Sequence, residues 1–519
     1  MTQPGGEGAA PARGARFRLT LSQAALVSAG AFVLSAIASI ATTPYLVREL
    51  GVAAFGIMLA TVVLAGQLGP LQLGVPSAAI RLLSDARGRG DAGAQAAYLY
   101  ALAGLGLGAA ALMSLGFLAI APWAWGHGFG DGGGGGALLR EALGAIPAAT
   151  AVVATQGAVA VSLAGLVGEE RFGLVSSIRA VHGVGRSVVA VAAVALGGGV
   201  AAALWAQAAA DVLAALWAAA KLANGVRPRV TGGMVYRAAR QLVMLGIPFA
   251  LMDGLSALLV DGEKLVIGAV ESAADFTYYT VTATAAVRLT VLATAFSFVL
   301  VPRLSSLAAA GKSEDAGGLA TRVTRLTVAM MILMLGPLIA LTPELLTLWV
   351  GPDFAERAGL STRIVLVALF ANVAVHPAHS ALRALGRPMV LSALYAAELV
   401  LHVAVVYLAV RAWGLPGAAL AWGLRAVLDA VAQRVLAVRA LGTTLGPWSQ
   451  FWGPLAALAA LAAACHLLGG AAPWQLRPLA ALVFGAVSAL WLLSREDWRV
   501  VARTFRLHPV PGEARGQTP

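Results

Sequence analysis

The chain is a succession of long apolar stretches separated by short polar segments. A stretch of about 20 mostly apolar residues is long enough to cross a bilayer as a helix. The pattern therefore predicts membrane-spanning helices at residues 21–47, 54–80, 97–121, 138–166, 172–196, 200–220, 240–262, 274–301, 323–342, 360–382, 389–410, 416–438, 452–470 and 477–494. These fourteen spans are an even number, so we expect both ends of the chain on the same side of the membrane.

The composition agrees with this pattern. Of the 519 residues, 59% are hydrophobic and 12% are charged, and the mean hydropathy is +0.83. Such a chain is too apolar for a soluble globule, and we predict an all-α polytopic membrane protein. No cleavable signal peptide is apparent, because the segment Met1–Arg18 is polar and the first apolar stretch is already long enough to span. The single cysteine, Cys465, excludes an intramolecular disulfide framework.

The net charge of +12 is spread over the connections between spans, so it indicates membrane topology and not a nucleic-acid partner. Alternate loops are rich in Arg and Lys, among them Arg81, Arg87, Arg89, Lys221, Arg237, Arg240, Lys312, Arg322, Arg383, Arg434, Arg439, Arg495 and Arg499. The opposite loops carry only isolated basic residues, such as Lys264 and Arg357. The positive-inside rule then predicts that both termini are cytoplasmic.

Two halves of similar size are expected. The longest polar connection, Lys221–Gln241, lies near the middle of the chain, and the residues Gly168, Gly199 and Asp211 recur 218 positions later as Gly386, Gly417 and Asp429. The alternative is that helices rich in Ala and Gly align with almost anything. The expected division is a cytoplasmic tail 1–20, an N-lobe 21–221, a linker 222–240, a C-lobe 241–440, two further helices in 441–495 and a cytoplasmic tail 496–519.

One predicted span, Phe172–Leu196, carries three cationizable side chains on one helical face: Arg179, His182 and Arg186. An arginine at membrane depth costs about 2.5–3.5 kcal/mol on insertion scales, so such residues usually face a bundle interior or water. The stripe predicts the wall of a polar cavity. The alternative is that the arginines extend to the interfaces or pair with neighbouring carboxylates.

Other embedded polar residues are candidates for function. Arg288 lies in a predicted span among several threonines, whereas Arg48 and Arg81 flank the first hairpin and suit an interfacial position better than the lumen. Glu398 and His402 are four residues apart and suit either a proton relay or a buried hydrogen-bonded pair.

Arg425 and Asp429 are also four residues apart, which favours an intrahelical ion pair, with a coupling role for Asp429 as the alternative. No set of metal ligands can be assembled from the sequence, and no cofactor is expected.

The stretch 42–85 resembles the opening hairpin of the polysaccharide-exporting flippases in the multidrug/oligosaccharidyl-lipid/polysaccharide exporter superfamily. The matching residues are Pro44, Arg48, Leu50, Gly51, Phe55, Gly56 and Arg81. Further similarity follows in order at 245–284, PRLSSL (302–307), LTLWVGPDF (346–354), ALRALGRP (381–388) and GLPGAALAWGL (414–424). Where the family usually has Asp-Arg in its seventh helix, this chain has Asp261-Gly-Glu-Lys264.

The resemblance implies about fourteen helices in two pseudo-repeated lobes around a central cavity. It also implies a transporter, not an enzyme, that moves an undecaprenyl-pyrophosphate-linked oligosaccharide across a bacterial inner membrane by alternating access. Besides this substrate and the membrane lipids, the expected partner is a polysaccharide polymerase, and the chain is expected to be a monomer. Two alternatives from the same superfamily stay open: a cation-coupled multidrug antiporter, disfavoured because 21–47 contains no acidic residue, and a flippase for a lipid-linked peptidoglycan precursor.

A lipid pyrophosphate needs replacement of its hydration as it crosses, and the guanidinium group supplies a fork of donors that matches phosphate oxygens. The expected substrate contacts are therefore Arg179, Arg186 and Arg288, with His182, Arg48 and Arg81 as further candidates.

Overall fold

The computed structural model describes residues 21–128, 135–223, 228–290, 304, 307, 312–385, 388–467, 482–483 and 485–486. Helices make up the described chain, and ten of them are long and apolar enough to cross a membrane. The prediction of an all-α polytopic membrane protein is confirmed. The expected last span, 477–494, falls almost wholly outside the described residues.

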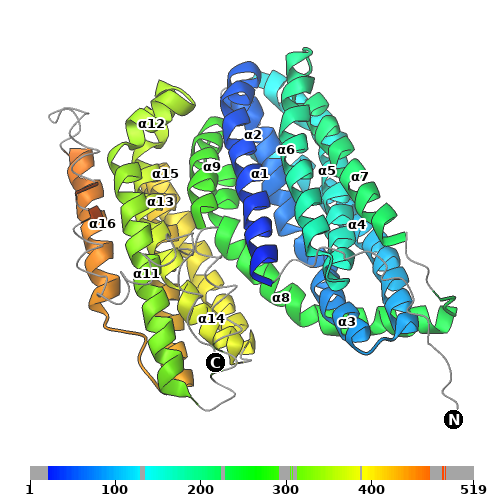
Figure 1. The fold of residues 1–519 in the computed structure, drawn as a ribbon. Coiled ribbons are helices and arrows are strands. Elements are labelled where there is room, and N and C mark those ends of the chain that lie inside the picture. Colours follow the sequence, from blue (N-terminus) through cyan, green and yellow to red (C-terminus); the bar gives the residue numbers. More distant parts are fainter. Residues whose placement is uncertain are drawn as a thin grey trace, which may run out of the picture.

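The helices form two groups that stand side by side (Figure 1). The first group contains α1 (Leu21–Leu50), α2 (Val52–Gln67), the short η1 (Gly69–Gln72), α3 (Val75–Gly88), α4 (Ala92–Gly128), α5 (Gly135–Gly168), α6 (Phe172–Ala195) and α7 (Val200–Ala223). In this group α1 packs on α6, and α5 packs on both α4 and α7. We call this group the N-lobe.

The second group, which we call the C-lobe, follows the long helix α8 (Gly232–Val270). It contains α9 (Ala273–Val287), η2 (Arg288–Thr290), α11 (Ser313–Ala340), α12 (Thr342–Trp349), α13 (Pro352–Ala374), α14 (His376–Ala384), α15 (Pro388–Leu441) and α16 (Ser449–Leu467). Helix α13 is at its centre and packs on α9, α11, α12, α15 and α16.

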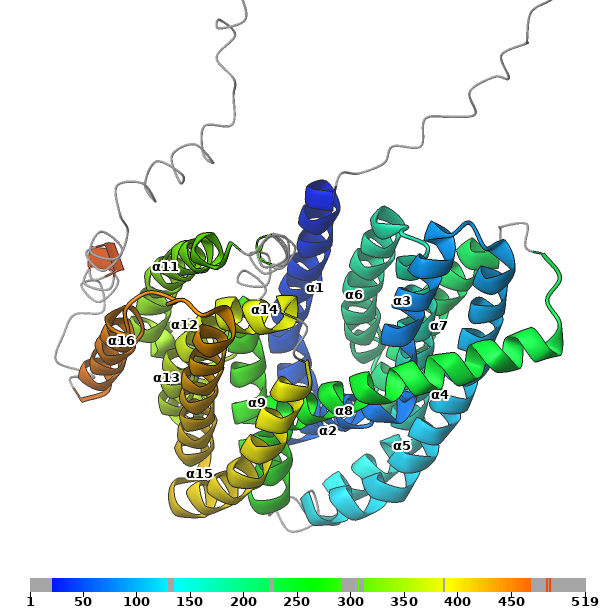
Figure 2. The same cartoon turned by 90° about the horizontal axis from the view of Figure 1, so that it is seen from below.

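Helix α8 belongs to both lobes. It packs on α3 and α4 near its start and on α15 further along, and Figure 2 shows it crossing between the two groups. Its 39 residues make a rod of about 58 Å. Helix α8 itself connects the lobes, and its start overlaps the linker expected at 222–240.

The predicted span 54–80 is broken into two helices that meet at an angle of 43°. Between them Leu73 and Gly74 have positive φ values of 52° and 62°. Here the chain presses against α8 so closely that a Cβ on Gly74 would lie 2.1 Å from the carbonyl oxygen of Gly246. Because only glycine fits this approach, the break is set by the contact between the two backbones.

The predicted spans 389–410 and 416–438 both lie in α15, and they meet at a kink at Gly414, whose φ is 58°. A positive φ is the conformation that glycine adopts without steric cost. The two spans are thus separated by backbone geometry and not by a polar loop.

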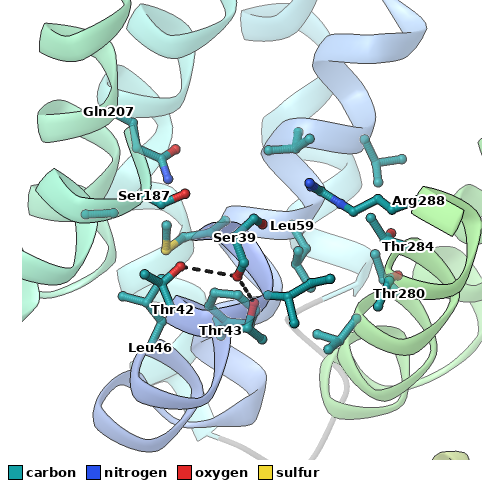
Figure 3. Close-up of a pocket in the computed structure, with 18 of the residues that line it drawn as sticks. Ser39, Thr42, Thr43, Leu46, Leu59, Ser187, Gln207, Thr280, Thr284 and Arg288 are labelled. Atoms are coloured by element: carbon teal, nitrogen blue, oxygen red, sulfur yellow. Dashed lines mark hydrogen bonds between the residues drawn. The ribbon is translucent and has the colours of Figure 1, made fainter. Parts of the chain in front are cut away.

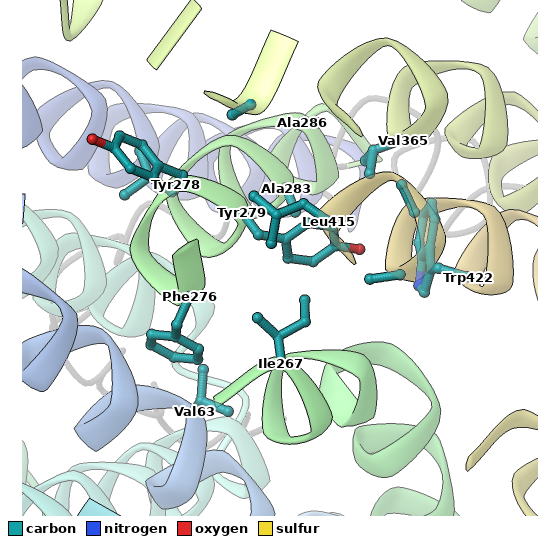
Figure 4. Packing of buried hydrophobic residues seen from close by; sticks show 14 of the residues in the cluster. Val63, Ile267, Phe276, Tyr278, Tyr279, Ala283, Ala286, Val365, Leu415 and Trp422 are labelled. Carbon is teal, nitrogen blue, oxygen red and sulfur yellow. The ribbon is translucent and has the colours of Figure 1, made fainter. Parts of the chain in front are cut away.

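The lipid-facing surface and the core are both apolar. Leu107, Leu213 and Val400 point outward with 74%, 68% and 78% of their surfaces exposed, as expected of side chains that face acyl chains. Inside, one apolar cluster connects the lobes, and Figure 4 shows Val63 of α2 near Ile267 of α8 and Phe276 of α9. The lobes therefore touch along α2 and α9.

Candidate functional site

A cavity of about 160 Å³, lined by both polar and apolar side chains, lies between the lobes. Its N-lobe wall comes from α1, α2, α6 and α7, and its C-lobe wall comes from α9, η2 and α12. Hydroxyl and amide side chains from both walls face it, namely Ser39, Thr42, Thr43, Ser187, Gln207, Thr280 and Thr284 (Figure 3).

Arg288 is the cation of this cavity. It caps the C-terminal end of α9, and its guanidinium group points from the C-lobe wall toward the side chains of α1 (Figure 3). No charged neighbour acts on it within the described part of the chain. The side chain therefore presents to the space between the lobes a positive charge that no described residue neutralises.

Thr280, Thr284 and Arg288 repeat every four residues, which places them along one face of α9. The hydroxyl of Thr280 is almost completely buried, and it has no hydrogen-bond partner among the described residues. A buried hydroxyl without a partner costs free energy unless a ligand or water supplies one. This face thus offers an unused donor and acceptor close to the cation.

The hydroxyls of α1 were not singled out by sequence reasoning. Thr42 donates to the carbonyl oxygen of Ala38 at 2.9 Å, and Thr43 donates to that of Ser39 at 2.7 Å. Each hydroxyl keeps its acceptor capacity on the cavity side. The spacing of Ser39, Thr42 and Thr43 by three and four residues is the signal that predicts one polar helix face.

His182 and Arg186 meet in a different place, a polar network between α5, α6 and α7. Asp211 Oδ1 lies 2.6 Å from His182 Nε2 and 3.8 Å from Arg186 Nη1. Arg186 also donates to Gln207 Oε1 at 3.2 Å, and Thr155 donates to Asp211 at 3.2 Å. Asp211 neutralises Arg186, so this cation is held by a carboxylate inside the N-lobe.

The remaining predicted cations lie apart from the cavity. Arg179 is partly buried between α1 and α6, with its guanidinium carbon 5.2 Å from the centre of the Phe32 ring. Arg48 at the end of α1 and Arg81 on α3 are exposed. Of the six predicted substrate contacts, the structure brings His182 and Arg186 together and places Arg288 alone in the space between the lobes.

The C-lobe contains a second set of buried polar groups on α15. His402, Arg425 and Asp429 are 3%, 6% and 5% exposed. Both ring nitrogens of His402 have no hydrogen-bond partner among the described residues, whereas the carboxyl group of Glu398 interacts with that of Asp429. The four-residue spacing of Glu398 and His402 therefore does not produce a direct hydrogen bond in this conformation.

The expected ion pair between Arg425 and Asp429 is absent from the described structure. Asp429 instead accepts a hydrogen bond from Gln433 Nε2 at 2.6 Å, and Arg425 lies 5.8 Å from the centre of the Trp422 ring. An amide on the next helical turn competes for the carboxylate, and the guanidinium group turns toward the aromatic face. Lys264, expected in a loop, instead lies in α8, where it is 4% exposed and pairs with Asp261, and Glu263 beside it is also buried.

Two groups of long apolar helices with a cavity between them define this chain as a polytopic membrane protein. The sequence then gives its family. The chain belongs to the polysaccharide biosynthesis protein family, whose sequence profile matches residues 21–308, more than half of this chain. The resemblance seen in the sequence motifs is thereby confirmed.

A curated relative agrees with this family. A Shigella flexneri protein whose name assigns it to O-antigen transport is 24% identical over 200 residues, which cover 38% of this chain. The matched region spans 46% of the relative, about half of its length.

Solved structures share the fold. The lipid II flippase MurJ in an inward closed conformation matches with a TM-score of 0.61 and 13% identity, over 92% of this chain and 99% of MurJ. An inward-facing multidrug resistance MATE transporter matches with a TM-score of 0.60 and 13% identity, over 82% and 96% of the two chains. A MOP superfamily transporter from Pyrococcus furiosus matches with a TM-score of 0.57 and 14% identity, over 82% of this chain and 98% of that transporter.

Proposed function

We propose that this protein flips an undecaprenyl-pyrophosphate-linked oligosaccharide from the cytoplasmic to the outer leaflet of a bacterial inner membrane, for the synthesis of a surface polysaccharide. The observation that carries the proposal is Arg288, a guanidinium group in the cavity between the lobes with no charged neighbour among the described residues. A pyrophosphate that leaves water needs fixed donors, and a guanidinium group matches its oxygens with two parallel hydrogen bonds.

The surrounding hydroxyls support a glycan next to the phosphate. Ser39, Thr42 and Thr43 on one wall face Thr280 and Thr284 on the other. The hydroxyls of Thr42 and Thr43 can accept from sugar hydroxyls, because their own hydrogens bond the backbone, and that of Thr280, which has no partner among the described residues, can also donate. Arg186 has a different part, because Asp211 already neutralises it. It links α6 to α7, and its hydrogen bond to Gln207 Oε1 orients that amide side chain, which lines the cavity.

The placement of charge supports the direction. Arg81 and Arg87 on α3 and Arg383 on α14 lie at one end of the bundle, and α12 lies at the other end (Figure 1). By the positive-inside rule, α3 and α14 are then cytoplasmic and α12 is on the outer side. We place both termini in the cytoplasm, and we propose that the chain acts as a monomer that delivers its substrate to a polymerase.

The test is genetic. In a strain that lacks the gene, the lipid-linked glycan that accumulates on the cytoplasmic face is identified, and rescue is attempted with wild type, Arg288→Ala, Arg288→Lys and Arg140→Ala. Arg140 is an exposed arginine on α5 and serves as the matched control. We expect wild type and Arg140→Ala to restore transport, and Arg288→Ala to lower it by at least about tenfold, the effect of losing a charged hydrogen bond.

Arg288→Lys keeps the charge without the planar fork, so it is expected to restore transport only in part. Full rescue by Arg288→Ala would remove Arg288 from the substrate path. Accumulation of a peptidoglycan precursor in place of a surface glycan would identify that precursor as the substrate.

A further inference from the structure

A hydrogen bond joins α12 of the C-lobe to α1 of the N-lobe, between residues 309 positions apart in the sequence. The indole nitrogen of Trp349 donates to the carbonyl oxygen of Ile40 at 2.8 Å. Both residues line the cavity that contains Arg288. The bond therefore connects the two lobes at the wall of the proposed substrate site.

The acceptor is free because of the sequence of α1. In an α-helix the carbonyl oxygen of residue 40 accepts from the backbone nitrogen of residue 44, and residue 44 is Pro44, which has no N–H. Ile40 is thus left with an unused carbonyl in the middle of a membrane helix, where an unsatisfied backbone group is costly. Trp349 supplies the missing donor from the opposite lobe.

The donor, Trp349, is the last residue of the short helix α12. Helix α12 packs on α13, and two residues after Trp349 the chain turns at Gly351, whose φ is 123°. The same indole also lines a second, apolar cavity of about 170 Å³ between α9, α12 and α13. Trp349 therefore stands between two cavities and has apolar space on its far side.

We propose that the Trp349–Ile40 hydrogen bond is a latch that holds the lobes together on the α12 side of the cavity, and that its breakage opens the cavity to that face of the membrane. The proposal rests on the proposed function for its direction, because α12 is on the outer side in that topology. Pro44 is the other half of the latch, since it keeps the acceptor free for Trp349.

The test uses two variants that break the same bond from opposite ends. Trp349→Phe removes the donor and keeps an aromatic ring. Pro44→Ala restores the backbone N–H that competes for Ile40 inside α1. Because both changes remove one interaction, their effects should not multiply in the double variant.

Opening is read with Ser187→Cys, at a position that lines the cavity on α6, in a background where the native cysteine is removed by Cys465→Ala. A membrane-impermeant maleimide is added to spheroplasts, which expose the outer face, or to inverted vesicles, which expose the cytoplasmic face. We expect either variant to raise labelling from the outer face by about two- to tenfold, the range for one neutral hydrogen bond. We expect the double variant to label no faster than the faster single variant.

Two matched controls lie away from the latch. Trp413→Phe changes a tryptophan that is 65% exposed, and Pro122→Ala changes a proline inside α4. Neither should alter labelling from the outer face. If only one of the two latch variants accumulates in the membrane, its labelling alone decides the question.

Unchanged labelling in the latch variants, multiplied effects in the double variant, or equal increases from both faces would overturn the proposal. The measurement needs no substrate, so its result is independent of the rescue by Arg288 variants. If the latch variants leave labelling unchanged while Arg288→Ala still lowers transport, the latch is refuted and the substrate assignment stands. If the latch variants raise labelling while Arg288→Ala transports normally, the substrate assignment is refuted and the latch stands.

Discussion

Arg186 and Asp211 form a buried ion pair between α6 and α7, with 3.8 Å between Nη1 and Oδ1. The Asp211 side chain is fully buried, and that of Arg186 is 19% exposed. His182 shares the same carboxyl oxygen. The pair connects two neighbouring helices of the N-lobe and removes the charge that Arg186 would otherwise carry alone.

Asp211→Asn should therefore destabilise the fold. The asparagine keeps the shape but leaves Arg186 without its counter-charge, and breaking a buried pair typically costs about 3–5 kcal/mol. The measurement is the unfolding free energy of purified protein in detergent, with Asp85→Asn, an exposed aspartate on α3, as control. Equal stability of Asp211→Asn and wild type would show that the pair contributes nothing.

Gly183 on α6 should not tolerate a side chain, because a Cβ there would lie 2.0 Å from Ser35 Oγ of α1. We expect Gly183→Ala to cost about 1–3 kcal/mol through overpacking. Gly185→Ala is the control, since nothing lies within 4 Å of its added Cβ. Adding Ser35→Gly should restore much of the loss, and a failure to do so would contradict the contact. The readout is the thermal unfolding midpoint.

Thr280→Val should separate stability from transport. Its buried hydroxyl has no partner in the described structure, so replacing it by a methyl group should leave the stability unchanged or raise it by about 1 kcal/mol. Thr277→Val is the control, because the Thr277 hydroxyl donates to the Ala273 carbonyl oxygen at 2.8 Å. Transport should fall in Thr280→Val if the hydroxyl serves the glycan. A less stable Thr280→Val protein would mean that this hydroxyl already has a partner.

Glu398→Gln tests the proposed coupling role of Glu398, His402 and Asp429. The glutamine has the shape and neutral charge of the protonated acid, so a proton relay through Glu398 would be fixed in one state. We expect transport in Glu398→Gln vesicles to lose its dependence on an imposed pH gradient. Glu356→Gln, on an exposed part of α13, should keep that dependence. An unchanged response in Glu398→Gln would exclude this residue as the relay.

The helices were largely predictable from the sequence, because runs of apolar residues long enough to span a bilayer leave few alternatives. The break between α2 and α3 was not, since it depends on the contact of Gly74 with Gly246, which lies 172 positions away. The separation of the predicted spans 389–410 and 416–438 agrees with the structure, which divides α15 at the non-helical residue Gly414.

The site was predictable only in part. Helical periodicity placed Arg179, His182 and Arg186 on one face, and that geometry is local. Arg186 pairs with Asp211 on a neighbouring helix, which agrees with the alternative that the arginines pair with carboxylates. Periodicity within one helix cannot say which carboxylate of another helix will lie close enough. Arg288 was found from its embedded charge, whereas Ser39, Thr42 and Thr43 were missed because a hydroxyl on an apolar helix satisfies itself on its own backbone.

The crossing of Gly74 and Gly246 has a mechanical consequence. No side chain separates the two backbones there, and α8 stays on the N-lobe further along, where Gln67 donates to the carbonyl oxygen of Ala257 at 3.3 Å. Beyond Ala257 the helix continues for about 20 Å to Val270, next to the start of α9. A tilt of the N-lobe would therefore carry α8 with it and move the start of α9.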